Sequence, residues 1–100
     1  MASQDKILSD IVERFGNVKS FIKKDDWKTA EMFLEVILDL SADLKNVEFA
    51  KILQQRTVTI IDALKQHNKL ISIPHIDTTL KFIKKGKNAT GAELVKAQFV

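Results

Sequence analysis

The chain has 100 residues, of which 45% are hydrophobic and 29% are charged. This balance is typical of one folded domain, and it excludes a disordered or collagen-like chain. The sequence contains no cysteine, which excludes disulfide bonds, thiolate zinc sites and cysteine nucleophiles. It also lacks an apolar segment long enough to cross a bilayer and the features of a secretory signal. We therefore expect an intracellular protein with no membrane partner.

The two halves of the chain differ in charge, although the net charge is only +3. Residues 1–50 carry 7 basic and 10 acidic side chains, whereas residues 51–100 carry 9 basic and 3 acidic ones. Such a small net charge does not by itself indicate a nucleic-acid partner. The asymmetry predicts an acidic half and a basic half of one molecule.

Apolar residues at steps of three and four predict two long helices in the first half of the chain. The first begins near Ser3, has Asp5 in its first turn and ends before a short loop at residues 23–26. Asp25 or Asp26 then caps a second helix, which ends within residues 41–46. Its inward positions are Ala30, Phe33, Leu34, Ile37, Leu40 and Leu44, and Val36 and Leu38 widen this stripe. A wide stripe favours a central helix that is buried on more than one side.

The second half predicts three further helices and a tail. One helix covers residues 47–55, and another covers 56–66, with or without a kink near Thr57, where β-branched residues cluster. Residues 67–73 are expected to form an apolar loop, and Pro74 fits the first turn of a fifth helix that ends near Lys85. A capping box at residues 90–93 predicts a short final helix at residues 91–98. The expected fold is therefore all-α, a compact bundle of about five helices at residues 1–87 with a short helical tail at residues 88–100.

The sequence shows no motif of an enzyme. It has no nucleophile elbow and no glycine-rich phosphate loop. His67 and His75 do not share a helical turn and have no cluster of carboxylates near them, so neither indicates a metal site. We interpret His67 as a solvated helix end and His75 as a surface residue of a first turn. We therefore expect no catalytic residues, no cofactor, no metal and no small-molecule substrate.

Two interhelical loops combine charged and large apolar side chains. The candidate partner-binding residues in these loops are Asp25, Asp26, Trp27, Lys69, Leu70, Ile71 and Ser72. One of the two aspartates is expected to cap a helix, and the other can accept hydrogen bonds from a partner. The large apolar side chains are either lids over the core or anchors for a partner.

A second candidate surface is basic. Its lysines cluster at the end of the last long helix, at Lys81, Lys84, Lys85 and Lys87. Cations at a helix C-terminus also complement the helix dipole, so this cluster is either a solvated helix end or a nucleic-acid patch.

Three stretches of the sequence resemble a known family. They are Lys24-Asp25-Asp26 before the second helix, residues 52–57 (ILQQRT), and residues 60–67 (IIDALKQH), which an apolar loop and a final helix follow. Residues 21–87 are thus similar to the N-terminal domain of transcription elongation factor S-II, and within that group to the integrase-binding domain of lens-epithelium-derived growth factor. The resemblance consists of the pattern of hydrophobic residues and of these short sequence matches.

The resemblance implies a function in protein interaction. In such domains, two loops at one end of the bundle receive short disordered peptides, an acidic loop residue accepts backbone hydrogen bonds, and apolar loop residues hold hydrophobic side chains. The matching positions here are Asp25 or Asp26, Leu70 and Ser72. It also implies partners in transcription or on chromatin, and hence a nuclear location. The expected partner segments are disordered linear motifs, acidic or hydrophobic, and the basic second half favours those that carry acidic residues. The alternatives are a nucleic-acid-binding domain and a bundle that oligomerises through residues 26–44.

Overall fold

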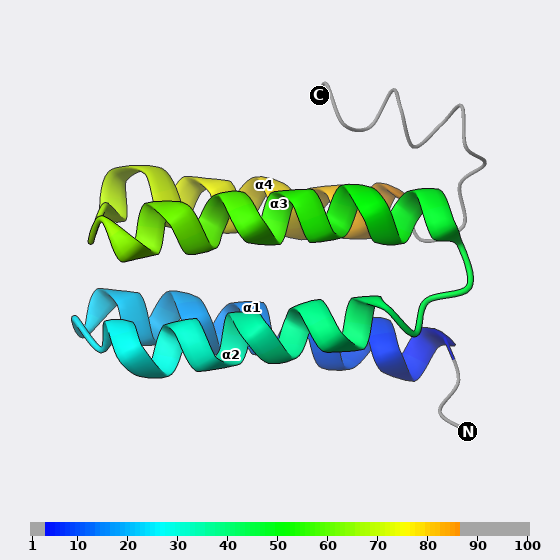
Figure 1. The fold of residues 1–100 in the computed structure, drawn as a ribbon, viewed down its shortest axis with the longest axis horizontal. Helices are drawn as coiled ribbons and strands as arrows, with labels where there is room; N and C mark the ends of the chain where they lie inside the picture. The colour runs from blue at the N-terminus through cyan, green and yellow to red at the C-terminus, as the bar shows by residue number, and fades with distance from the viewer. Residues whose placement is uncertain (1–3, 87–100) are drawn as a thin grey trace.

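The computed structural model describes residues 4–86, and these form four helices and no strand. The helices are α1 (Gln4–Lys23), α2 (Trp27–Ser41), α3 (Val47–Lys65) and α4 (Lys69–Gly86). They run alternately up and down, and each packs against two neighbours in the cyclic order α1, α2, α3, α4. The α1–α2 and α3–α4 loops lie together at one end, which we call the closed end, and the α2–α3 connection lies at the opposite, open end (Figure 1). The all-α helical bundle expected from the sequence is confirmed. Ser3, Lys87 and the expected tail at 88–100 lie outside the described residues.

The long helix α3 differs from the expected pair of helices at residues 47–55 and 56–66. The helix is continuous because its β-branched residues pack in the core or form hydrogen bonds within the helix. Thr57 and Ile60 are fully buried, and the Thr57 hydroxyl donates to the Leu53 carbonyl at 2.8 Å. The Thr59 hydroxyl makes the same bond to Gln55 at 3.0 Å. Burial and these local bonds thus outweigh the strand preference of the segment.

The apolar loop expected at residues 67–73 is also shorter in the structure, because α4 begins at Lys69. Asn68 caps it: its side-chain oxygen accepts a hydrogen bond from the Ile71 amide at 3.1 Å. Pro74 therefore lies inside the helix rather than in its first turn. Since proline has no N–H, the carbonyl of Leu70 loses its usual helical donor. Leu70, Ile71 and Ser72 are consequently helical residues, not loop residues.

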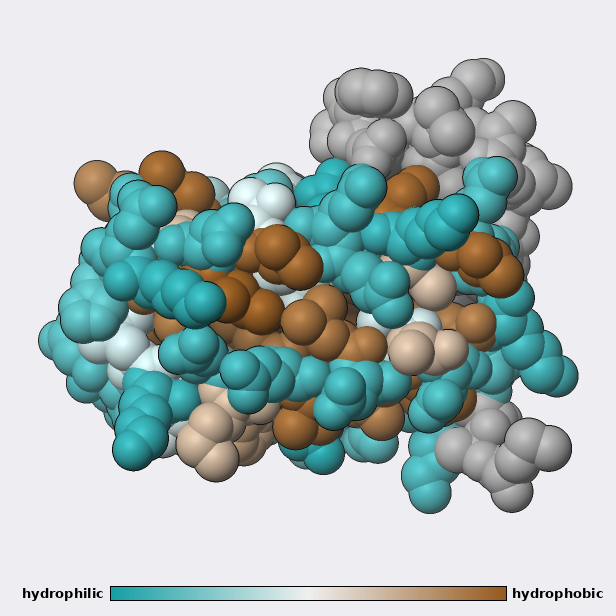
Figure 2. Space-filling model, in the orientation of Figure 1, coloured by the Kyte–Doolittle hydropathy of each residue, from teal (hydrophilic) through white to brown (hydrophobic). Residues whose placement is uncertain are grey.

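Helix α2 is not central, contrary to the expectation from its wide apolar stripe. Leu34 and Ile37 are fully buried, whereas Phe33 and Leu40 are half-buried at the edge of the core. Val36 is 37% exposed. In a ring of four helices each one faces the core on a single side, so no helix can be buried all round. Brown apolar patches accordingly remain visible between charged side chains on the face formed by α2 and α3 (Figure 2).

The two loops at the closed end have the same construction. Two residues after the first helix of each hairpin comes a left-handed residue, Asp25 (φ 63°) or His67 (φ 52°). Its amide and the amide of the next residue donate hydrogen bonds back to carbonyls of the last helical turn. This is the Schellman arrangement, which normally favours glycine. The following residue, Asp26 or Asn68, caps the next helix through its side chain. Asp25, Asp26 and Trp27 thus correspond to residues 42 positions further along, His67, Asn68 and Lys69.

The same spacing of 42 relates the cores of the two helical hairpins, α1–α2 and α3–α4. Every buried residue between positions 7 and 44 has a buried counterpart 42 positions later. The first set is Ile7, Leu8, Ile11, Phe15, Val18, Ile22, Ala30, Leu34, Ile37, Ser41 and Leu44. The counterparts are Phe49, Ala50, Leu53, Thr57, Ile60, Leu64, Ser72, Ile76, Thr79, Ile83 and Gly86. The bundle is therefore a structural repeat of two hairpins, although the sequence shows no repeat.

Few residues are identical between the hairpins, which explains why the repeat cannot be seen in the sequence. Over the described helices only Arg14 and Arg56, Lys23 and Lys65, and Leu38 and Leu80 match at this spacing. The repeat is useful because it shows what the fold requires at a position. Where one hairpin has a polar residue and the other an exposed apolar one, the apolar side chain is not needed for folding.

Gly16 offers a stability prediction. It lies exposed in the middle of α1, and a Cβ atom added there would meet nothing within 4 Å. Since glycine costs about 1 kcal/mol relative to alanine inside a helix, Gly16→Ala is expected to raise the free energy of unfolding by up to about that amount. Urea denaturation of the variant measures it. The counterpart Val58→Gly should lower stability, and a loss of stability in Gly16→Ala would contradict the open environment.

Candidate functional site

Two reciprocal contacts hold the hairpins together at the closed end. Lys69, the first residue of α4, makes an ion pair with Asp25 at 2.8 Å. Trp27, the first residue of α2, stacks on His67, with ring centroids 4.6 Å apart and planes 5° from parallel. In each contact the first residue of one hairpin's second helix meets the left-handed residue of the other hairpin. The two contacts are therefore equivalent in the repeat but different in chemistry.

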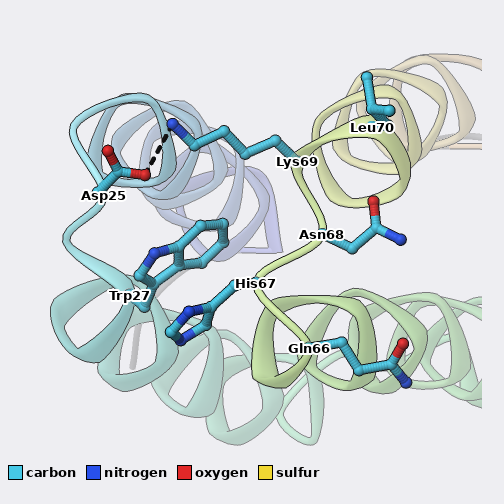
Figure 3. A pocket seen from close by; sticks show the side chains of 7 residues that line it. All are labelled: Asp25, Trp27, Gln66, His67, Asn68, Lys69 and Leu70. Carbon is cyan, nitrogen blue, oxygen red and sulfur yellow. Dashed lines mark ion pairs between the residues drawn. The ribbon is translucent and has the colours of Figure 1, made fainter.

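These contacts border an open hollow of about 520 Å³ (Figure 3). It is lined by Asp25, Trp27, Gln66, His67, Asn68, Lys69 and Leu70. A neighbouring hollow of about 450 Å³ shares Asp25, Trp27 and His67 and adds Lys28, Glu31 and Lys65 among its lining residues. The stacked rings thus border both hollows, and each hollow combines an aromatic wall with lysine side chains.

Both candidate carboxylates also have roles within the chain. Asp25 pairs with Lys69, and its side chain is still 68% exposed. Asp26 caps α2, since its Oδ1 accepts a hydrogen bond from the Thr29 amide at 3.3 Å. A carboxylate has room for further hydrogen bonds, so both exposed groups can still accept from outside.

The apolar candidates differ in their exposure. Leu70 is 89% exposed and Ile71 is 51% exposed, so neither covers the core as a lid. Trp27 is half-buried and packs against the core. Ser72 is fully buried in α4 and does not lie on this surface. The structure thus brings Asp25, Trp27, Lys69 and Leu70 to one hollow and separates Ser72 from them.

The basic cluster lies elsewhere. Lys81, Lys84 and Lys85 are exposed in the last turns of α4, at the open end. They do not share a surface with the loops at the closed end, and Lys87 lies outside the described residues.

His75 differs from the surface residue expected from the sequence. It is half-buried, and its Nε2 atom is buried with no hydrogen-bond partner. Burial lowers the pKa of His75 below 6.5, and the nearby positive charge of Arg56 lowers it further. Burial also lowers the pKa of Arg56, whose guanidinium lies 5.1 Å from the Phe82 ring centroid. His75 occupies the counterpart position of Phe33, over which Arg14 lies at 5.7 Å.

Neither metal binding nor membrane insertion finds support in the described part of the chain. Residues 4–86 contain no group of three or more histidine, aspartate or glutamate side chains that could hold a metal ion. Within the same residues, no helix has the length and apolarity needed to span a bilayer.

Three residues of the hollow were not among the candidates from the sequence: Gln66, His67 and Asn68. Asn68 had a detectable signal, because asparagine is a preferred N-cap and the residues after it are compatible with a helix. His67 had none, since a left-handed histidine at a helix end cannot be distinguished in sequence from a solvated one. Gln66 lies in the hollow because it directly follows the end of α3 at Lys65.

No protein-family model, characterised protein or solved structure matches this chain.

The buried hydroxyl of Ser72 gives a prediction that separates folding from binding. Its Oγ atom has no hydrogen-bond partner, so Ser72→Ala is expected to raise the free energy of unfolding by about 1 kcal/mol through relief of desolvation. Ser41→Ala is the matched control. It should lower the free energy of unfolding, because the buried Ser41 hydroxyl donates a hydrogen bond to the Leu38 carbonyl at 2.7 Å. Equal losses in both variants, measured by urea denaturation, would show that Ser72 has a partner.

His75 predicts a pH dependence of stability. Because its pKa is lower in the folded state than in the unfolded chain, the unfolded state binds the proton more readily. Above pH 6.5 His75 is neutral in both states and does not lower the free energy of unfolding. As the pH drops below 6.5, the unfolded chain binds the proton first and the free energy of unfolding falls. His75→Phe, which places phenylalanine as in the other hairpin, should flatten the dependence between pH 7.5 and 5.5. Parallel denaturation profiles of variant and wild type over this range would contradict this account.

Proposed function

We propose that the closed end of the bundle docks a short segment of a protein partner and performs no catalysis. The hollow between the two loops receives an apolar side chain of the segment, with Leu70 and Trp27 as its apolar walls. The exposed carboxylates of Asp25 and Asp26 accept hydrogen bonds from its backbone. Both loops are needed because the hollow has lining residues from each of them.

The observation that carries this proposal is the exposed side chain of Leu70. Its counterpart in the other hairpin is Lys28, and the counterpart of Ile71 is Thr29. Polar residues therefore satisfy the fold at these two positions. An apolar side chain that is 89% exposed and not needed for folding marks a surface that binds something apolar.

The charges of the closed end favour a partner segment with acidic residues. Its loops and adjoining helical turns carry five lysines, Lys23, Lys24, Lys28, Lys65 and Lys69, against four carboxylates, Asp25, Asp26, Glu31 and Asp62. Electrostatic complementarity of this kind directs encounter and orientation more than it adds affinity. The proposed ligand is thus an extended peptide that combines apolar and acidic side chains.

The cellular setting of the proposal comes from the family resemblance. It places the partners in the transcription machinery or on chromatin, and the protein in the nucleus. A nucleic-acid ligand would instead use Lys81, Lys84 and Lys85 at the open end, far from Leu70. Its binding would weaken steeply and linearly in log salt, whereas docking of an apolar peptide would change little.

A displayed library of random peptides, selected on the full chain, tests the proposal. Trp27 is the only tryptophan, so binding of a selected peptide is followed by its fluorescence. Leu70→Lys is expected to weaken binding at least tenfold and to leave thermal unfolding unchanged, since Lys28 occupies the equivalent position. Val47→Lys, at an exposed valine of the open end, is the control and should bind like wild type.

Two results would contradict the proposal. One is equal affinity of the wild type and Leu70→Lys for every selected peptide. The other is the selection of no peptide while a single-stranded oligonucleotide binds with a steep salt dependence.

A further inference from the structure

A second apolar groove lies between α1 and α4 toward the open end, away from the docking hollow. Leu8 and Val12 of α1 and Leu80 and Ile83 of α4 line it, and its volume is about 410 Å³. Asp5 and Ser9 on one side and Lys84 on the other complete its lining. On the opposite side of the bundle, residues 42–46 join α2 to α3 at this end and bury Leu44. Within residues 4–86, no connection covers α1 and α4 in the same way.

The repeat shows that the fold does not require an apolar side chain at the exposed position of this groove, Val12. Val12 is 41% exposed, and its counterpart in α3 is Gln54. Leu8 and Ile83 instead belong to the core, so Val12 is the one exposed apolar side chain of this lining. Gly16 lies one helical turn beyond Val12 on the same side of α1. The fold does not require glycine there, since an added Cβ atom would meet nothing within 4 Å and the counterpart residue is Val58. A glycine at that position leaves room for another helix to approach closely.

The charges beside the groove are complementary across it. Beside the groove, helix α1 carries Asp5 and the exposed Glu13, whereas α4 carries Lys84 and the exposed Lys81. Nearer the closed end, Lys19 of α1 and Asp77 of α4 have the reverse order and pair with each other at 2.8 Å. A surface with an acidic border on one side and a basic border on the other can match a rotated copy of itself.

We propose that the groove binds the same groove of a second copy of this chain, related by a two-fold axis that runs along the groove. This rotation places α1 of each copy across α4 of the other, in antiparallel orientation. The rotation leaves each residue at the same position along the bundle axis. Ser9 and Val12 of one copy therefore lie opposite Leu80 and Ile83 of the other, since these residues line the same part of the groove. The acidic border of each copy therefore faces the basic border of the other. A two-fold axis across the groove would instead set α1 against α1 and bring like charges together.

The size of this face sets the strength of the dimer. A helix of 20 residues is about 30 Å long, and two packed helices span about 20 Å, so each copy offers about 600 Å². The total of about 1,200 Å² lies at the lower limit of specific interfaces. We therefore expect a reversible dimer that forms at micromolar or higher concentrations and weakens as salt is added.

Sedimentation equilibrium of the full chain over a wide concentration range tests the dimer. Val12→Gln is expected to raise the dimer dissociation constant at least tenfold, and it should fold normally because glutamine occupies the counterpart position. Val58→Gln removes an exposed valine of α3, outside this groove, and is the matched control. Lys81→Glu should dissociate the dimer, and the double variant Glu13→Lys with Lys81→Glu should restore it.

Several outcomes would overturn the proposal. The proposal is wrong if the chain stays monomeric at every concentration, whatever the cause. One such cause would be that another part of the chain covers the groove. A dimer that Val12→Gln leaves intact, or that Val58→Gln weakens as much, would place the interface elsewhere. The double variant failing to restore association would contradict the two-fold arrangement. None of these substitutions touches the closed end, so the result does not depend on the proposed peptide docking.

Discussion

The arrangement of the closed end depends on two residues with left-handed backbone, Asp25 and His67. Each ends a helix and turns the chain within three residues, so that the next helix begins beside the other hairpin. A non-glycine residue in this conformation is uncommon, and here each one contacts the first residue of the opposite hairpin's second helix. The ion pair and the ring stack thus connect the two turns, and the hollow between them exists because both turns lie at the same level.

The repeat of two hairpins separates what the fold needs from what the surface offers. Every buried position from 7 to 44 matches a buried position of the second hairpin, and the two further buried residues of that hairpin, Ala63 and Phe82, match the half-buried Phe21 and Leu40. The core therefore explains the four helices without reference to function. Leu70 and Val12 stand out because lysine and glutamine serve at the equivalent positions. Leu70 lies at the closed end and Val12 near the middle of α1, and the docking hollow shares no lining residue with the groove of the proposed contact between copies.

Helical spacing of apolar residues predicted the all-α bundle and the first two helices. The cap of the second helix was predicted at Asp25 or Asp26, and the structure has it at Asp26. The spacing could not predict that residues 47–65 form one helix, because the strand preference around Thr57 is overcome only by burial against other helices. Nor could it place Leu70 on an exposed helical turn, since Pro74 suggested a later helix start. The sequence predicted that the two loops contribute to one site, but the contacts of His67 depend on a left-handed turn that no local signal reveals.

The most direct test of the account is the map of backbone amide NMR shifts when a library-selected peptide is titrated into the full chain. The account predicts that the largest changes cluster at residues 25–28 and 66–71, at the closed end, with both loops affected by the same peptide. Changes confined to one loop, or centred on the last turns of α4, would contradict it.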